Sequence, residues 1–221
     1  MSLDAVLKVG GSLGRGRDLL PLCRELGRLG ARYRLLVVPG GGESADIVRN
    51  QYRRFGLSET TAHRMALLAM DQYGCLLGDL TPGSVLCMDI LSARQAAESG
   101  RVPVLLPASI LIQADPLPHS WQVTSDAIAA WVAGLARAPR LVLLKDVDGL
   151  YSAAPTESGA GRLLPHLSAE EMAGHRGGVD EYLATVLAAA DVETWVVNGR
   201  HHARLAELLD TGRTLGTHIS R

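Results

Sequence analysis

Two lysines stand out in this 221-residue chain because the other twenty of its 22 basic residues are arginines. Lys8 directly follows the apolar residues 5–7, and Lys145 directly follows the apolar residues 141–144. A codon preference for arginine explains the shortage of lysine, but it does not explain these two positions. A lysine ammonium is a compact point charge that suits a phosphate group, whereas an arginine guanidinium is a planar fork. The two positions therefore indicate a site that handles phosphate.

Two glycine-rich turns follow successive apolar runs. The first holds Gly10, Gly11 and Ser12, and the second holds Gly40, Gly41 and Gly42. Without a Cβ, glycine lets backbone amides approach an anion, and the second turn also opens a predicted helix whose dipole favours one. A single pair of glycines is most often only a tight turn, but two such turns favour an anion site. The chain contains neither the Gly-Lys pair of a Walker P-loop nor the dinucleotide pattern G-x-G-x-x-G.

A third polar segment, Thr124, Ser125 and Asp126, precedes the apolar residues 127–136. One interpretation is a helix N-cap, in which a hydroxyl accepts a backbone amide and Asp126 benefits from the helix dipole. The other is that Asp126 holds the lysine ammoniums in place. The two interpretations are compatible, and the sequence leaves both open.

The apolar runs are the elements that must position these residues. They lie at residues 5–7, 35–38, 85–87, 104–106, 141–144 and 195–197. Unbroken hydrophobicity is typical of parallel strands covered on both faces, and stripes of helical period lie between the runs. We therefore predict an α/β fold, a three-layer α/β/α sandwich with a mainly parallel central sheet. In such a sheet the ligand binds at the carboxyl ends of the strands, where both lysines fall.

Two segments, residues 107–122 with three prolines and residues 152–165 with two glycines and two prolines, are too irregular for this core, and we predict flaps or hairpins there. The three cysteines, Cys23, Cys75 and Cys87, have no ligand or disulfide spacing and are predicted to be buried, reduced thiols. The seven histidines show no metal-ligand spacing either, so no metal site is predicted.

Composition limits the partners. A formal net charge of −1 excludes the broad basic surface of a general nucleic-acid binder. The longest apolar run, residues 127–136, is too short to span a bilayer, and no signal peptide is recognisable. We expect a cytoplasmic protein with no nucleic-acid or membrane partner.

Five sequence motifs are spread over nearly the whole chain: K-x-G-G-S at 8–12, P-G-G-G at 39–42, T-S-D at 124–126, D-V-D-G-x-Y at 146–151 and G-T-x-I at 216–219. Taken together, they resemble the motifs of the amino acid kinase superfamily. Further stretches resemble a narrower group, the [5-(aminomethyl)furan-3-yl]methyl phosphate kinases of methanofuran-type cofactor synthesis. These are residues 62–66, 70–74, 120–126, 179–183 and 196–199.

The resemblance implies a single amino acid kinase-like domain over residues 1–221. Its acceptor-binding lobe would cover about 1–120 and its nucleotide-binding lobe about 121–221. The implied reaction transfers the γ-phosphoryl group of ATP, with Mg²⁺ as partner of the nucleotide, to a small phosphate monoester. The product would be a diphosphate used in one-carbon metabolism. A homo-oligomer is expected from the resemblance alone.

The resemblance also implies residue roles. Lys8 would contact the transferring phosphoryl group, and Asp126 would orient the lysine. Gly10, Gly11 and Ser12 would hold nucleotide phosphates, whereas Gly40, Gly41, Gly42 and Thr124 would hold the acceptor. The nucleoside would be bordered by Asp146, Asp148, Gly149 and Tyr151, although Asp-Gly after a strand is also an ordinary turn signal.

The acceptor's aminomethyl group would be cationic, so a carboxylate should meet it. Asp46, Asp71 and Asp180 are candidates, although a solvated helix residue is the simpler explanation for each. Arg49 and Arg64 would bind the acceptor phosphate or merely form surface ion pairs. Trp121 would stack on the furan ring or fill the base of the flap.

One departure from the superfamily pattern affects the charge at the site. Many members carry a second lysine in G-G-M-x-x-K, but residues 177–182 place Tyr182 there, on an apolar stripe that favours a core role. We expect Lys145 to supply the missing charge, with Arg162 in the second irregular segment as the other candidate. The missing lysine also motivates an alternative, a non-catalytic nucleotide or oxyanion binding or storage protein.

The enzyme alternatives are uridylate kinase and isopentenyl phosphate kinase. Isopentenyl phosphate kinases usually carry a histidine shortly after the second glycine turn. Residues 43–46 are Glu-Ser-Ala-Asp here, which argues against that activity.

Overall fold

A computed structural model describes residues 2–153, 161–173 and 178–220 of the chain. The strands are β1 (Ala5–Val9), β2 (Leu35–Pro39), β3 (Ser84–Cys87), β4 (Val102–Leu105), β5 (Arg140–Lys145), β6 (Leu150–Tyr151), β7 (Leu163–Leu164), β8 (His166–Ser168), β9 (Glu193–Asn198) and β10 (Gly216–Ser220). The helices are η1 (Gly11–Arg15), α1 (Leu19–Gly30), α2 (Gly42–Phe55), α3 (Glu59–Leu80), α4 (Ile90–Glu98), α5 (Ala108–Ala114), α6 (Ser125–Leu135), α7 (Ala169–Ala173), α8 (Leu183–Ala190) and α9 (Ala203–Thr211).

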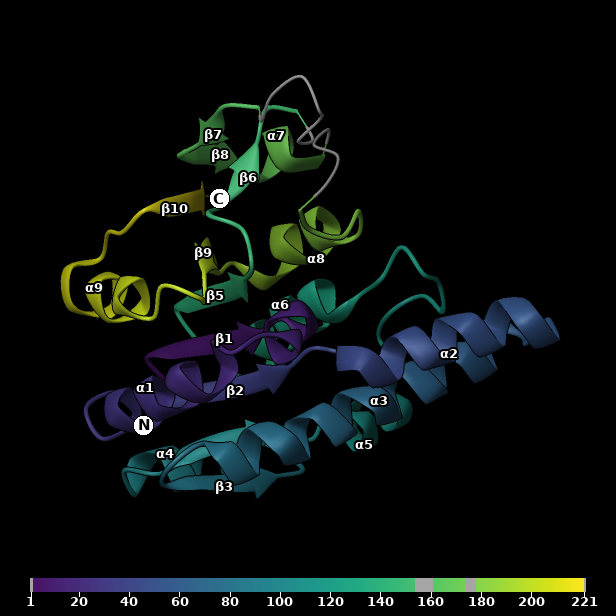
Figure 1. Cartoon of the computed structure of the whole chain (residues 1–221), viewed down its shortest axis with the longest axis horizontal. Helices are drawn as coiled ribbons and strands as arrows, with labels where there is room; N and C mark the ends of the chain where they lie inside the picture. Colours follow the sequence, from purple (N-terminus) through teal and green to yellow (C-terminus); the bar gives the residue numbers. More distant parts are fainter. Residues whose placement is uncertain (1, 154–160, 174–177, 221) are drawn as a thin grey trace.

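The central sheet has eight strands in the order β3-β4-β2-β1-β5-β9-β10-β8 (Figure 1). All neighbours pair in parallel except β9 and β10, which are antiparallel. A small hairpin of β6 and β7 stands beside it. The predicted mainly parallel sheet is therefore confirmed, and β1 and β5, which carry the two lysines, are direct neighbours at its centre.

Alternate residues of the unbroken apolar strands belong to two separate hydrophobic cores, one on each face of the sheet. Leu7 and Val142 belong to the core under α1 and α9, whereas Val6 and Leu143 belong to the core under α4, α6 and α8. Because side chains alternate along a strand, each apolar run supplies both faces of the sheet. The arrangement is the predicted three-layer α/β/α sandwich.

Three expectations need correction. The segment 107–122 was expected to be irregular, but it contains α5, because Pro107 comes just before the first helical residue, where its missing N–H is not needed. Cys75 was expected to be buried but is exposed on α3, whereas Cys23 and Cys87 are buried. The apolar stripe on which Tyr182 lies is helical only from the next residue, because α8 begins at Leu183 and Tyr182 is its N-cap residue. Residues 154–160 of the segment 152–165 lie outside the described residues. The same is true of Gly177, the first residue of the stretch 177–182 that departs from the superfamily pattern.

Among the described residues, no helix combines the length and apolar character needed to cross a bilayer.

Candidate active site

Because side chains alternate along a strand, both lysines point toward the same helix, α6. Lys8 lies two residues beyond Val6 on β1, and Lys145 lies two residues beyond Leu143 on β5, so both project from the face that α6 covers. The two strands pair with Lys8 opposite Leu143, which brings the two side chains to the same edge. The first turn of α6 meets that edge and contributes Asp126.

Asp126 joins the two lysines. One carboxylate oxygen, Oδ1, lies 2.8 Å from Lys8 Nζ, and the other, Oδ2, lies 2.6 Å from Lys145 Nζ. The side chains of Lys8 and Asp126 are only 6% and 3% exposed, whereas that of Lys145 is 15% exposed. Two ammoniums and one carboxylate leave a net positive charge at the carboxyl edge of the sheet, where a phosphoryl group can meet it.

The electrostatics of this cluster favour the ionised carboxylate. Burial raises the pKa of Asp126, but the Lys8 and Lys145 charges outweigh burial and lower that pKa to about 2. Burial and the Lys145 charge lower the pKa of Lys8, and Asp126 opposes them. Asp126 is therefore the counter-charge that makes two buried ammoniums tolerable.

The start of α6 is fixed by a second carboxylate. Asp180 accepts hydrogen bonds from the Thr124 amide at 3.0 Å, the Thr124 hydroxyl at 2.8 Å and the Ala127 amide at 2.9 Å. Thr124 is the N-cap of α6, and its hydroxyl accepts from the Asp126 amide at 3.4 Å. Both interpretations of the T-S-D segment are thus correct, because Thr124 caps the helix and Asp126 holds the lysines. All three hydrogen bonds go to Oδ2, which anchors this turn, whereas the buried Oδ1 has no hydrogen-bond partner among the described residues.

The two glycine turns pack against each other beside this cluster. A Cβ on Gly11 would lie 2.5 Å from the Gly42 amide nitrogen, and one on Gly40 would lie 2.8 Å from the Gly11 nitrogen. Gly42 also has φ +58, a conformation that favours glycine. The Gly10 amide donates to the Leu144 carbonyl of β5 at 2.9 Å, and the Gly40 amide donates to the Val9 carbonyl of β1 at 2.8 Å, so these two amides are already engaged by neighbouring strands.

An open pocket of about 210 Å³ lies next to the glycine turns. Its lining includes Gly11, Ser12, Arg15, Gly41, Gly42, Asp46, Arg49, His63, Trp121, Thr124 and Ser125. Asp46 forms ion pairs with Arg15 and, at 3.2 Å, with Arg49. The Arg49 guanidinium lies 4.8 Å from the centre of the Trp121 ring. The pocket therefore offers two cations, one carboxylate and an aromatic face.

A model described as the amino acid kinase family matches residues 5–198. The chain belongs to the amino acid kinase family. The fold and the relatives of the chain are those of kinases, so the protein is a phosphotransferase.

Three similar proteins are informative. The [5-(aminomethyl)furan-3-yl]methyl phosphate kinase of Methanocaldococcus jannaschii is 30% identical over 217 residues, which cover 97% of this chain and 96% of that protein. A uridylate kinase of Methanothrix thermoacetophila is 26% identical over 96% of each chain. The crystal structure of uridylate kinase from Archaeoglobus fulgidus superposes with a TM-score of 0.78 at 22% identity, covering 99% of this chain and 100% of that one.

Several residues expected at the kinase site do come together. Lys8, Asp126 and Lys145 form one cluster, and the acceptor candidates Gly41, Gly42, Asp46, Arg49, Trp121 and Thr124 line one pocket. Gly11 and Ser12, expected on the nucleotide side, line that pocket as well. Tyr182 packs against the core, in agreement with its predicted role.

Other expected residues lie elsewhere. Asp71 accepts a hydrogen bond from the Ala108 amide at 3.0 Å, so its carboxylate fixes the start of α5, and it does not line the pocket. Asp148 pairs with Arg204 and accepts from Asn198 at 2.9 Å, and Asp146 has only a loose 3.7 Å pair with Arg200. Arg204 and Asn198 lower the pKa of Asp148.

The neighbours of Asp148 form a tight corner. A Cβ on Gly149 would lie 2.5 Å from the Thr217 hydroxyl, which in turn accepts from the Leu150 amide at 2.8 Å. Tyr151 continues into β6. The D-V-D-G-x-Y segment thus forms a tightly packed, hydrogen-bonded turn at the carboxyl end of β5.

Sequence reasoning missed Arg15, His63 and Ser125 as pocket residues. Ser125 follows directly from its neighbours in the T-S-D segment. His63 lies in the stretch 62–66 that resembles the narrower kinase group, although that resemblance did not mark it as a pocket residue. Arg15 carries no such signal, because it reaches the pocket only through the packing of η1 against α2.

Proposed function

We propose that this kinase transfers the γ-phosphoryl group of ATP to a small phosphate monoester and forms a diphosphate. The observation that carries the proposal is the cluster of Lys8 and Lys145 on Asp126, at a sheet edge adjoining a pocket with its own cations. Phosphoryl transfer depends mainly on positioning and on neutralising the phosphoryl oxygens. Two fixed ammoniums supply that neutralisation without reorganisation.

The step balances without a general base. An anionic oxygen of the acceptor phosphate attacks the γ-phosphorus, a new P–O bond forms, and the bond to the β,γ-bridging oxygen breaks. The electron pair leaves with ADP. Lys8 and Lys145 face the charge that spreads over the γ-phosphoryl oxygens.

The proposed acceptor is [5-(aminomethyl)furan-3-yl]methyl phosphate, as in methanofuran-type cofactor synthesis. Arg15 and Arg49 suit the acceptor phosphate, Asp46 suits its ammonium group, and Trp121 suits the furan ring. The relative from Methanocaldococcus supports this choice by its name. Uridylate is the second candidate, because uridylate kinases of 26% and 28% identity also match nearly the whole chain.

We propose that the nucleotide binds at the first glycine turn and at the turn formed by residues 146–151. Mg²⁺ prefers oxygen ligands and usually binds with the phosphates of its nucleotide. The carboxylates nearest the cluster are already engaged, Asp126 by two lysines and Asp180 by the start of α6. Mg²⁺ would therefore arrive on ATP, where it would neutralise phosphate charge. A homo-oligomer and a division into lobes near residue 120 remain predictions.

The test is an acceptor panel. Purified full-length protein with Mg-ATP is given aminomethylfuran phosphate, the same phosphate with its amine acetylated, UMP or isopentenyl phosphate. ADP release is followed in a coupled assay, and the diphosphate is identified by phosphorus NMR. We expect turnover with the free amine, a higher KM for the acetylated acceptor, and none above background with isopentenyl phosphate.

Turnover on UMP alone would overturn the acceptor assignment while keeping a phosphate-accepting kinase. Tight ATP binding with no transfer to any acceptor would instead support the non-catalytic alternative. The matched control is Lys8→Met, which must abolish any turnover attributed to this site.

A further inference from the structure

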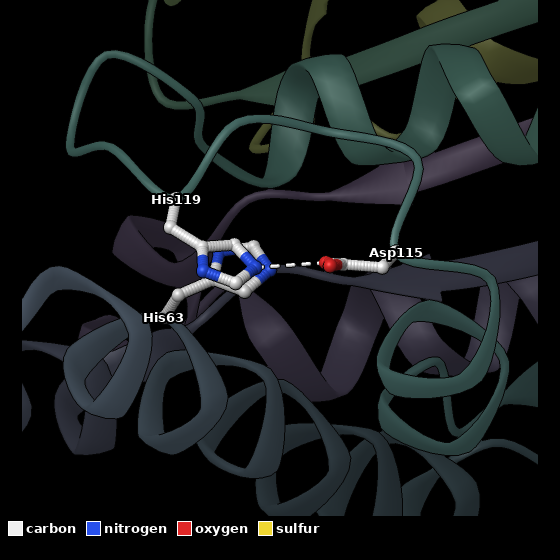
Figure 2. A group of neighbouring side chains, drawn as sticks. All are labelled: His63, Asp115 and His119. Atoms are coloured by element: carbon white, nitrogen blue, oxygen red, sulfur yellow. Dashed lines mark hydrogen bonds and ion pairs between the residues drawn. The ribbon is translucent and has the colours of Figure 1, made fainter.

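Three potential metal ligands converge beside the pocket, although the sequence spacing of the histidines gives no sign of it. His63 comes from the second turn of α3, Asp115 is the residue after α5, and His119 comes from the loop that follows. Figure 2 shows both imidazole rings lying over each other with nitrogen atoms turned toward the Asp115 carboxylate. The three ligand atoms all lie within 4.8 Å of one another.

The local contacts hold two of these ligands in position. His119 Nε2 lies 2.7 Å from Asp115 Oδ1, and its other nitrogen, Nδ1, lies 2.9 Å from the Thr60 hydroxyl. The His63 ring stacks on the His119 ring, with centroids 4.4 Å apart and an interplanar angle of 20°. A histidine whose second nitrogen has an outer partner is oriented in the manner of metal-binding histidines.

We propose that His63, Asp115 and His119 bind a divalent transition-metal ion of the Zn²⁺ class. Two imidazole nitrogens and one carboxylate oxygen form a ligand set that such ions prefer. Mg²⁺ and Ca²⁺ prefer all-oxygen sites, so this site is distinct from the Mg²⁺ that accompanies ATP. Ligand atoms held about 2.0–2.2 Å from one tetrahedral Zn²⁺ ion lie about 3.3–3.6 Å from one another. Metal binding would therefore lengthen the 2.7 Å contact between His119 and Asp115, and the remaining separations, all within 4.8 Å, need only small side-chain movements.

The site would join two parts of the pocket wall. His63 lines the pocket on α3, and Trp121, two residues after His119, lines it from the loop. A bound ion would tie this loop to α3 and fix Trp121 at the pocket. Metal binding at this site does not depend on which acceptor the kinase uses.

The test measures metal binding directly, on full-length protein stripped with a chelator and free of nucleotide. Zn²⁺ is titrated by calorimetry, and Co²⁺ is added in a parallel experiment as a spectroscopic probe. We expect one equivalent of Zn²⁺ and a Co²⁺ absorption spectrum of tetrahedral intensity. His63→Ala and His119→Ala should each weaken Zn²⁺ binding at least about tenfold.

The matched control removes the adjacent pair His201 and His202, which lie at the start of α9 and away from the pocket. That double alanine variant should bind Zn²⁺ as the wild type does. Circular dichroism without metal verifies that all variants are folded, and Zn²⁺ should raise the melting temperature of the wild type and the control only. Unchanged affinity in His63→Ala and His119→Ala, or no stoichiometric binding by the folded wild type, would overturn the proposal.

Discussion

The molecule carries two charged clusters a short distance apart, and they are built in opposite ways. In the cluster of Lys8, Asp126 and Lys145 the side chains are 6%, 3% and 15% exposed. In the pocket cluster Arg15, Asp46 and Arg49 are 57%, 42% and 37% exposed. The first cluster is set on two central strands and the first turn of a buried helix, whereas the second lies on η1 and the solvent side of α2.

The difference in burial separates two tasks. Buried charges interact strongly and reorganise little, so the lysine cluster is suited to meeting the transition state of phosphoryl transfer. Exposed ion pairs contribute little to stability and exchange partners readily, so the pocket cluster is suited to binding one acceptor or another. The buried cluster should therefore control rate and folding, and the exposed one should control acceptor affinity.

The sharpest way to break this comparison is Lys8→Met. The substitution removes one buried cation but leaves Asp126 paired with Lys145, so the fold should persist. We expect kcat to fall by about 10³-fold, the typical loss for one preorganised group at a transition state. Lys8→Arg should lose most of the rate as well, because a planar fork does not replace a point charge. Near-normal kcat in either variant would exclude Lys8 from the transfer step.

The second test is Asp126→Asn, which removes the shared counter-charge. The sequence alone, in which Asp126 caps a helix and orients a lysine, predicts that the substitution spares folding and lowers activity. The structure predicts a large effect on folding, because two nearly buried ammoniums lose their carboxylate, at a cost of about 3–5 kcal/mol in the free energy of unfolding.

Denaturant titrations measure this cost, and the double variant Lys8→Met/Asp126→Asn is its control. Removing one of the two unmatched charges should recover part of the lost stability. If the double variant is as unstable as the sum of the single ones, the coupling between these groups is absent.

The contrast between the clusters also explains what the sequence could predict. Unbroken apolar runs mark strands buried on both faces, and the alternation of side chains along β1 and β5 puts Lys8 and Lys145 on the side of α6. The lysine cluster thus follows from local pattern plus one rule of sheet geometry. Pro107 misled the prediction of α5, because proline marks both loops and helix starts.

The exposed cluster and the histidine cluster could not be predicted in this way. Arg15 meets Asp46 across 31 residues of sequence, and His63 meets His119 only because the loop after α5 folds back over α3. Such contacts depend on how helices and loops pack, which no periodicity encodes. The resemblance to a family indicated Asp46 and Arg49 on α2 and also Trp121, but it gave no sign that Arg15 pairs with Asp46 or that His63 meets His119.

A third prediction concerns the stability of the fold at acidic pH. The pKa of Asp126 is lowered from 3.8 to about 2, so its contribution to stability is complete above about pH 4 and is lost as the pH falls toward 2. We expect the unfolding free energy of the wild type to fall more steeply over this range than that of Asp126→Asn, which lacks the titrating group. Equal slopes, measured by urea unfolding at several pH values, would show that Asp126 titrates normally.

The smallest expected effect belongs to the exposed cluster and tests its separate task. Arg49→Ala removes an exposed cation and its contact with Trp121, so the free energy of unfolding should change by less than about 0.5 kcal/mol. The KM for the phosphate acceptor should rise about tenfold, the loss of roughly 1.4 kcal/mol expected of one charge-assisted contact, with kcat nearly unchanged. Arg53→Ala is the matched control, because Arg53 lies on the same helix and does not line the pocket. If Arg49→Ala lowers kcat as strongly as Lys8→Met does, the exposed cluster takes part in the transfer step and the division between rate and affinity fails.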